Sequence, residues 1–152
     1  MNMILDDTHW MQYALHLAER AQTENEVPIG AVLVQDNQVL GEGWNQSIQN
    51  NDPSAHAEMI AIRAAAQHCQ NYRLPNTTLY VTLEPCPMCA GLLVNARIAR
   101  LVFATSDPRA GAVISVLRIL DTPTLNHRVA YESGVLAEPC SRVLKAFFKD
   151  RR

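Results

Sequence analysis

The sequence lacks the features of a membrane-spanning or secreted chain. No apolar run approaches the ~20 residues that a transmembrane helix requires. The first ten residues, MNMILDDTHW, do not contain the basic segment and apolar stretch of a signal peptide. We therefore expect a cytoplasmic protein with no membrane partner. The formal net charge of −2 argues against a broad electrostatic grip on nucleic acid. A local electrostatic contact with nucleic acid is compatible with this charge, because the last eight residues, KAFFKDRR, carry four basic groups.

Cysteine is also scarce, with four residues in the chain, Cys69, Cys86, Cys89 and Cys140. We expect no disulfides, because the chain shows no secretory signal and 152 residues can form a core without them. Cys86 and Cys89 form a C-x-x-C motif, which in an intracellular chain indicates metal or redox chemistry. No internal repeat or linker is visible, so the sequence predicts a single domain over residues 1–152.

Hydrophobic periodicity predicts alternating strands and helices. A helix opens the chain, with Thr8 as the candidate N-cap. Residues 27–34 and 38–45 flank a QDN turn and predict an antiparallel hairpin. An alanine-rich helix follows at 55–67, with Asp52 or Ser54 as its cap. We expect further strands at 77–83, 100–105 and 127–133, and further helices at 87–96, at 115–120 and around Cys140 to Phe147.

This order of elements predicts an α/β protein. Two strands come first, and helices then alternate with the later strands. We expect a three-layer α/β/α sandwich, in which one mixed five-stranded sheet carries helices on both faces. The later crossovers should be right-handed.

The segment AHAEMIA places His56 and Glu58 in an otherwise apolar run. Buried helices rarely hold two ionisable side chains without partners. Cys86 and Cys89 offer such partners, since they lie three apart at the start of a predicted helix and their sulfurs share one face. One imidazole and two thiolates suit Zn²⁺ and leave its fourth tetrahedral position open, which is the pattern of a catalytic site.

Glu58 is not needed as a ligand and is instead the candidate for proton transfer. Residues two apart on a regular helix point to nearly opposite sides. Glu58 therefore reaches the metal site only if the first turn is tucked into it or if the helix starts elsewhere. Simpler interpretations stand beside this one. The C-x-x-C motif alone is typical of redox or structural zinc sites, Glu58 could merely favour the helix dipole, and Glu84 is either structural or a support for the ligands.

H-x-E followed by P-C-x-x-C is the pattern of zinc-dependent nucleobase deaminases. The resemblance extends over nearly the whole chain, in order and at matching spacing. On these segments the sequence resembles the bacterial tRNA-specific adenosine deaminases, of the cytidine/deoxycytidylate deaminase superfamily. The segments are EVPIGAVLV, GEGWN, DPSAHAEMIAIR, NYRL, TLYVTLEPCPMCAG, NARI, NHRV and FFKDRR.

The resemblance implies a cytidine deaminase-like fold, one Zn²⁺ per chain and hydrolytic deamination of adenosine to inosine at the wobble position of a tRNA anticodon. It implies that a zinc hydroxide attacks C6 of a flipped adenine while Glu58 shuttles protons. It also implies a homodimer that binds the anticodon loop. The implied zinc ligands are His56, Cys86 and Cys89. The implied substrate-binding residues are Asn45, Ala57, Val27 and Leu83. The implied RNA contacts are Asp107, Arg109, Asn126, Phe148, Arg151 and Arg152.

The sequence departs from the family pattern in one loop. Arg109 stands where lysine is usual, and Val113 and Ile114 stand where a small residue and glycine are common, which changes the freedom of the loop backbone. Two other functions stay open at this point. One is deamination of a free base or nucleoside such as guanine or cytosine. The other is a non-catalytic, zinc-stapled RNA-binding subunit.

Overall fold

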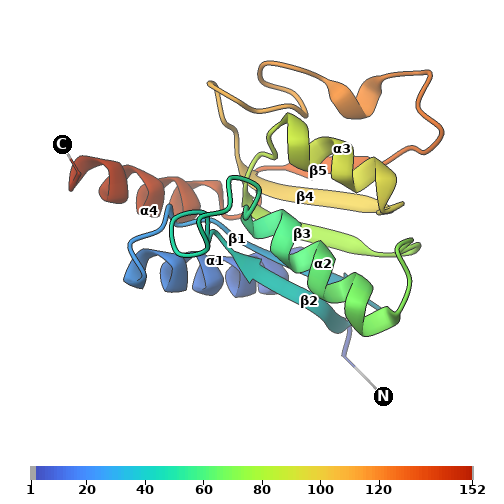
Figure 1. Ribbon diagram of the computed structural model, residues 1–152, viewed down its shortest axis with the longest axis horizontal. Coiled ribbons are helices and arrows are strands. Elements are labelled where there is room, and N and C mark those ends of the chain that lie inside the picture. Colours follow the sequence, from blue (N-terminus) through green and yellow to red (C-terminus); the bar gives the residue numbers. More distant parts are fainter. Residues whose placement is uncertain (1–2, 152) are drawn as a thin grey trace.

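The computed structural model describes residues 3–151, which form a mixed five-stranded sheet covered by helices (Figure 1). The strands are β1 (Gly30–Gln35), β2 (Gln38–Trp44), β3 (Thr78–Leu83), β4 (Arg100–Thr105) and β5 (Ala130–Ser133). The helices are α1 (Asp7–Thr23), α2 (Ala57–Cys69), α3 (Pro87–Asn95), α4 (Ala137–Lys149) and the short 3₁₀ helix η1 (Ile119–Asp121). Within residues 3–151 we find no helix that is long and apolar enough to cross a membrane.

The sheet has the strand order β2-β1-β3-β4-β5. β1 pairs antiparallel with β2 and with β3, whereas β3, β4 and β5 run parallel. The predicted hairpin and the predicted mixed five-stranded sheet are therefore confirmed. Parallel neighbours require crossover connections, and α3 supplies the one between β3 and β4.

The two faces of the sheet carry separate cores. Along β1, Ala31 and Leu33 face the core formed with α2 and α3, while Val32 and Val34 face the core formed with α1 and α4. This alternation follows from the two-residue period of a strand. The helix pairs α1/α4 and α2/α3 thus form the outer layers of the α/β/α sandwich that the sequence predicts (Figure 1).

Three local predictions were wrong. Thr8 lies inside α1, and the N-cap is Asp6, whose side chain accepts a hydrogen bond from the His9 backbone N–H. Neither Asp52 nor Ser54 caps α2, because the helix starts later than the sequence suggested. Residues 115–118 are not helical, and only a 3₁₀ turn forms at 119–121. Chain turns and caps are decided by local contacts, which periodicity does not report.

One edge of the sheet gathers several chain ends. β3 ends at Leu83 and leads through residues 84–86 into α3, and β1 starts beside it because the two strands are antiparallel. α2 also starts at this edge, since Asn45 at the end of β2 contacts Ala57. Ligands of open α/β sheets bind outside the carboxyl ends of parallel strands. This edge is therefore where the fold places a site.

Candidate active site

Three side chains that the sequence places far apart meet at this edge. The ligand atoms of His56, Cys86 and Cys89 lie within 4.8 Å of one another. His56 Nδ1 lies 3.5 Å from Cys86 Sγ and 3.7 Å from Cys89 Sγ. His56 comes from the start of α2, and the two cysteines come from the start of α3. The group could therefore hold a metal ion.

The start of α2 explains how Glu58 reaches the same place as His56. His56 is the N-cap of α2, with the extended dihedrals φ −74° and ψ 155°. It lies outside the helical repeat, so the rule that residues two apart point to opposite sides does not apply to this pair. Of the two explanations considered from sequence, the later helix start is the correct one.

Glu58 lies in the first turn of α2 and is only 4% exposed. Burial raises the pKa of its carboxyl group to about 7, although the nearby His56 acts in the opposite direction. A carboxyl group with a pKa near neutrality can both accept and donate a proton at physiological pH. This is the condition that general acid–base catalysis sets.

The thiols beside it are strongly perturbed. Hydrogen bonding from Cys89 lowers the pKa of Cys86 to about 4, with burial opposing this and His56 adding to it. The pKa of Cys89 is raised, because its thiol donates to Cys86 and is buried. Contact with Cys86 also raises the pKa of His56. The three side chains therefore share protons between their ligand atoms, and a bound metal ion would displace these protons.

Asn45 is held by a contact that fixes its amide orientation. Its Oδ1 accepts a hydrogen bond of 2.9 Å from the Ala57 backbone N–H. Because a backbone N–H needs an acceptor, the oxygen must face Ala57 and the NH₂ group must face away from it. The contact also supplies the cap that α2 lacks from its own residues.

The other residues expected near the substrate lie at the same edge. Val27 precedes β1 and Leu83 ends β3, and both are half-buried. Asn45 is 8% exposed and Ala57 is fully buried. The structure thus brings the four expected substrate-binding residues to the sheet edge that carries His56.

The residues expected to contact RNA are spread over three segments. Asp107 and Arg109 lie in the loop after β4, where Asp107 Oδ1 accepts the Arg109 backbone N–H. Asn126 is exposed and accepts a hydrogen bond from Arg97. The third segment is the end of α4. There Phe148 is 51% exposed, and Arg151 stacks on Phe147 and donates to Asn25, while Arg152 lies outside the described residues.

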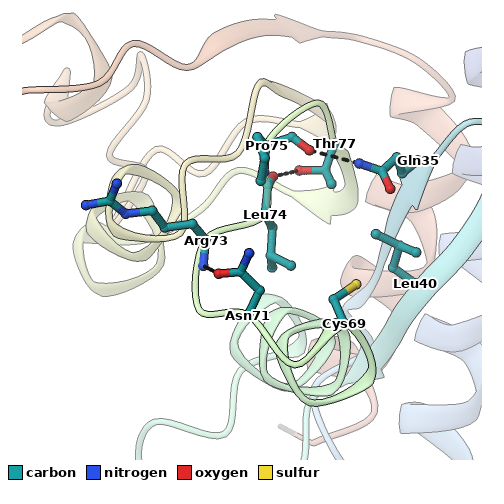
Figure 2. A pocket seen from close by; sticks show the side chains of 8 residues that line it. All are labelled: Gln35, Leu40, Cys69, Asn71, Arg73, Leu74, Pro75 and Thr77. Carbon is teal, nitrogen blue, oxygen red and sulfur yellow. Dashed lines mark hydrogen bonds between the residues drawn. The ribbon is translucent and has the colours of Figure 1, made fainter.

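A separate surface pocket lies far from this group. Figure 2 shows that it is lined by the C-terminal end of α2 and the segment before β3, with Cys69 and Leu40 on one side and the Arg73 guanidinium pointing away from them. α2 has 13 residues, so its two ends are separated by about 20 Å at about 1.5 Å per residue. The pocket therefore takes no part in the chemistry of His56 and Glu58.

Sequence reasoning left two buried carboxylates without a defined role. Glu26 is 1% exposed and accepts hydrogen bonds from the backbone of residues 48 and 49. Glu84 is 2% exposed and accepts hydrogen bonds from the loop after β4. Apart from the Ser115 hydroxyl, which donates to Glu84, their partners are backbone amides, which leave no signal in a sequence. The position of acidic residues at strand ends was the only hint available.

The fold and the site together define a deaminase of the α/β/α class. The sequence profile of the MafB19-like deaminase family matches residues 5–152, so the chain belongs to this family of deaminases. Within it, the chain is 54% identical over 147 residues to a tRNA-specific adenosine deaminase from Haemophilus influenzae, covering 96% of this chain and 85% of the relative. The chain is a member of the tRNA-specific adenosine deaminases.

Two further comparisons agree with this assignment. A tRNA-specific adenosine deaminase from Buchnera aphidicola is 43% identical, with 96% of each chain covered. A solved structure of a tRNA:A34 deaminase, studied for A-to-I editing at the wobble position, superposes with a TM-score of 0.87 at 44% identity. That match covers 90% of this chain and 99% of the solved one. The α/β/α fold expected from the sequence is thereby confirmed.

Proposed function

We propose that this protein is a zinc-dependent hydrolase that converts adenosine to inosine at the wobble position of a tRNA anticodon. The observation that carries the proposal is the convergence of His56, Cys86 and Cys89 beside the buried Glu58. The similarity to relatives named tRNA-specific adenosine deaminase supports the choice of substrate.

The spacing of the ligand atoms suits zinc. Tetrahedral zinc with Zn–S of about 2.3 Å and Zn–N of about 2.05 Å requires an N···S separation of about 3.6 Å. The two N···S distances here are 3.5 and 3.7 Å. Two thiolates and a neutral imidazole also balance the charge of a divalent ion. We propose one zinc per chain, held by these three ligands.

A zinc ion held by His56, Cys86 and Cys89 would lower the pKa of a bound water molecule, so that this water could serve as the nucleophile at neutral pH. The reaction exchanges the C6 amino group of adenine for the water oxygen, so that inosine and ammonia are the products. Glu58 accepts a proton from the nucleophile and delivers it to N1 of the base. It then takes the proton of the hydroxyl group now on C6 and passes it to the departing nitrogen, as the C6–N bond breaks and the C6 carbonyl forms. Burial keeps its pKa high enough to hold a proton between these transfers.

The surrounding residues position the base. We propose that Val27 and Leu83 form the walls of the base pocket. The Asn45 amide, whose oxygen is engaged by Ala57, presents its NH₂ group as a donor to an acceptor on the base edge. The backbone of Ala57 borders the same edge. A flipped base in an unpaired anticodon loop can enter such a pocket at low cost.

We further propose that the RNA is contacted by Asp107, Arg109 and Asn126 and by the end of α4. At this helix end Phe148 offers an exposed ring for stacking and Arg151 offers positive charge, and Arg152 follows in the sequence. We propose that residues 1–152 act as one deaminase domain, that two copies form a homodimer, and that the protein works in the cytoplasm, where tRNA is found. Sizing of the purified protein tests the dimer.

The decisive test uses two anticodon stem-loops, one with adenosine at the wobble position and one with adenosine elsewhere in the loop. We expect inosine only in the first. Activity on free guanine, cytosine or a nucleoside with none on the RNA would replace the proposal with a small-molecule deaminase. RNA binding without any deamination would replace it with a non-catalytic subunit.

A further inference from the structure

The loop after β4 is anchored on a single buried side chain. This loop, residues 106–118, carries Asp107 and Arg109. Glu84 Oε1 accepts hydrogen bonds from the Asp107 backbone N–H at 3.0 Å and from the Ser115 hydroxyl. Glu84 Oε2 accepts from the backbone N–H groups of Val113, Ile114 and Ser115 at 3.1, 2.8 and 3.0 Å. One carboxylate therefore fixes both ends of the loop.

The loop wraps closely around this carboxylate. A Cβ atom added at Gly111 would lie 2.4 Å from Glu84 Oε1, far inside van der Waals contact. With Glu84 only 2% exposed, water does not compete for its oxygens. Converging backbone N–H groups form a concavity suited to an anion. A glutamine would offer one acceptor oxygen and would turn an NH₂ donor toward other donors.

The anchor also sets where the loop stands relative to the metal ligands. Glu84 follows Leu83, at the wall of the base pocket, and precedes Pro85 and Cys86. The Ala112 backbone N–H donates to the Pro85 carbonyl at 2.8 Å, so a second bond ties the loop to the same segment. The position of Arg109 is therefore fixed relative to the base pocket through its loop's bonds to residues 84 and 85.

The loop on the other side of the site is held in a similar way by fewer bonds. Glu26 is 1% exposed, and its two oxygens accept from the Ile48 and Gln49 backbone N–H groups at 3.2 and 2.8 Å. These amides belong to the loop between β2 and α2. The two carboxylates thus hold separate loops at the same edge of the sheet, and each provides a control for the other.

We propose that Glu84 is a positioning residue for the RNA substrate: by fixing loop 106–118 it presents Asp107 and Arg109 to the RNA. The proposal rests on the proposed function, since it assumes that this loop contacts the anticodon stem-loop. It assigns Glu84 to RNA binding, whereas support of the zinc ligands would make the same residue necessary for metal retention. If Glu84 is replaced, the first role predicts weaker RNA binding and the second predicts loss of the metal.

The test compares Glu84→Gln, Glu26→Gln and the wild-type protein by hydrogen exchange, zinc content and kinetics on the stem-loop. In Glu84→Gln we expect faster exchange of amides in 107–116 with residues 46–51 unchanged, and the reverse in Glu26→Gln. For Glu84→Gln we expect zinc at the wild-type level, kcat within about threefold, and a KM for the stem-loop raised about tenfold, as loss of one or two bonds to a charged group implies.

Gly111→Ala provides a second variant that leaves Glu84 intact. Its Cβ must push the loop and the Glu84 carboxylate apart and so weaken the anchor, and the same rise in KM and the same exchange pattern are expected. Glu19→Gln, an exposed acid on α1, should match the wild type in every measurement.

Three results would overturn the assignment. They are an unchanged KM in both Glu84→Gln and Gly111→Ala, a fall in kcat accompanied by loss of zinc, and exchange in 107–116 equal to the wild type. If the wild-type protein itself forms no inosine, the proposed function fails, and the exchange data still decide whether Glu84 anchors the loop.

Discussion

Each end of the sheet carries a carboxyl group, but the pKa of this group is raised at one end and lowered at the other. At the carboxyl end of β3, Glu58 is buried and forms no ion pair within residues 3–151, and burial raises its pKa to about 7 although the nearby His56 opposes this. At the other end, where β3, β4 and β5 start, Asp7 forms a bidentate pair with Arg100 at 2.9 and 2.6 Å. The Arg100 guanidinium holds the pKa of Asp7 below its usual value, although partial burial opposes this and Tyr80 assists it.

This difference distinguishes a carboxyl group that stabilises the fold from one that is suited to a reaction. A carboxylate that is fully paired stays ionised and ties elements together, as Asp7 ties α1 to Arg100 of β4. An unpaired buried carboxyl group is costly for the fold and is retained where a reaction needs it. The pocket lined by Cys69 and Thr77 also lies at the Asp7 end of the sheet, since Thr77 directly precedes β3.

The largest expected effect follows from replacing Glu58. Glu58→Gln keeps the size of the side chain but cannot transfer protons, so we expect inosine formation to fall by about 10²–10⁴-fold, the usual contribution of a general acid–base group. Zinc content and thermal stability should not decrease, since Glu58 is not a ligand. Activity within a few-fold of the wild type would move the proton transfer to another residue.

A smaller effect should follow from pushing α2 away from the sheet. A Cβ atom at Gly43 of β2 would lie 2.5 Å from the Ala57 carbonyl oxygen and 2.8 Å from the Ala61 nitrogen. Gly43→Ala should therefore displace the start of α2, lower the free energy of unfolding by about 1–3 kcal/mol, and reduce both zinc content and activity.

Gly91→Ala is the matched control for this change. Nothing lies within 4 Å of a Cβ atom at Gly91, which is inside α3. We expect equal or slightly higher stability, because alanine favours a helix over glycine by roughly 0.5–1 kcal/mol. If both variants behaved alike in thermal melts and deamination assays, close packing of α2 on β2 would not be what positions Glu58.

At the opposite end of the sheet we expect a loss of stability that depends on pH. The folded pKa of Asp7 is depressed, so its contribution is complete above the unfolded pKa of about 4 and is lost as the pH falls through the folded value. Asp7→Asn should cost up to about 1 kcal/mol at pH 7, and the difference from the wild type should shrink below about pH 4.

Urea unfolding of Asp7→Asn at pH 7 and pH 3 measures this difference. Glu132→Gln, whose carboxylate also contacts Arg100 but is 60% exposed, should have a smaller effect. Equal destabilisation by Asp7→Asn at both pH values would show that the ion pair is not its source.

The smallest effect is expected at the surface pocket. Cys69 is exposed and lines this pocket at the far end of α2 from His56. Cys69→Ser should leave zinc content, melting temperature and inosine formation at wild-type values. A drop in zinc content would place Cys69 near the metal, contrary to the structure.

The sequence was sufficient to predict much of the fold. The hairpin, the parallel strands and α2 followed from hydrophobic periods, since each element buries a continuous stripe or face. His56, Cys86 and Cys89 could be grouped because metal ligands have a recognisable chemistry and spacing. The structure brings these three together, and it places Glu58 next to them.

The remaining features depend on contacts that residue types do not encode. The extended backbone of His56 as an N-cap decides the direction of Glu58, and periodicity places such boundaries only to within a few residues. The two interpretations of Glu84 could not be separated from sequence, because most of its partners are backbone N–H groups of a loop 23–31 residues away. The role of Glu26 could not be assigned for the same reason.

We propose that His56, Cys86 and Cys89 bind a zinc ion whose fourth position is open. X-ray absorption at the zinc edge of freshly purified protein tests it most directly. We predict one zinc per chain with two sulfur ligands at about 2.3 Å and two nitrogen or oxygen ligands at about 2.0–2.1 Å, unchanged in Cys69→Ser. A spectrum with three or four sulfur ligands, or protein that contains no zinc, would contradict the account.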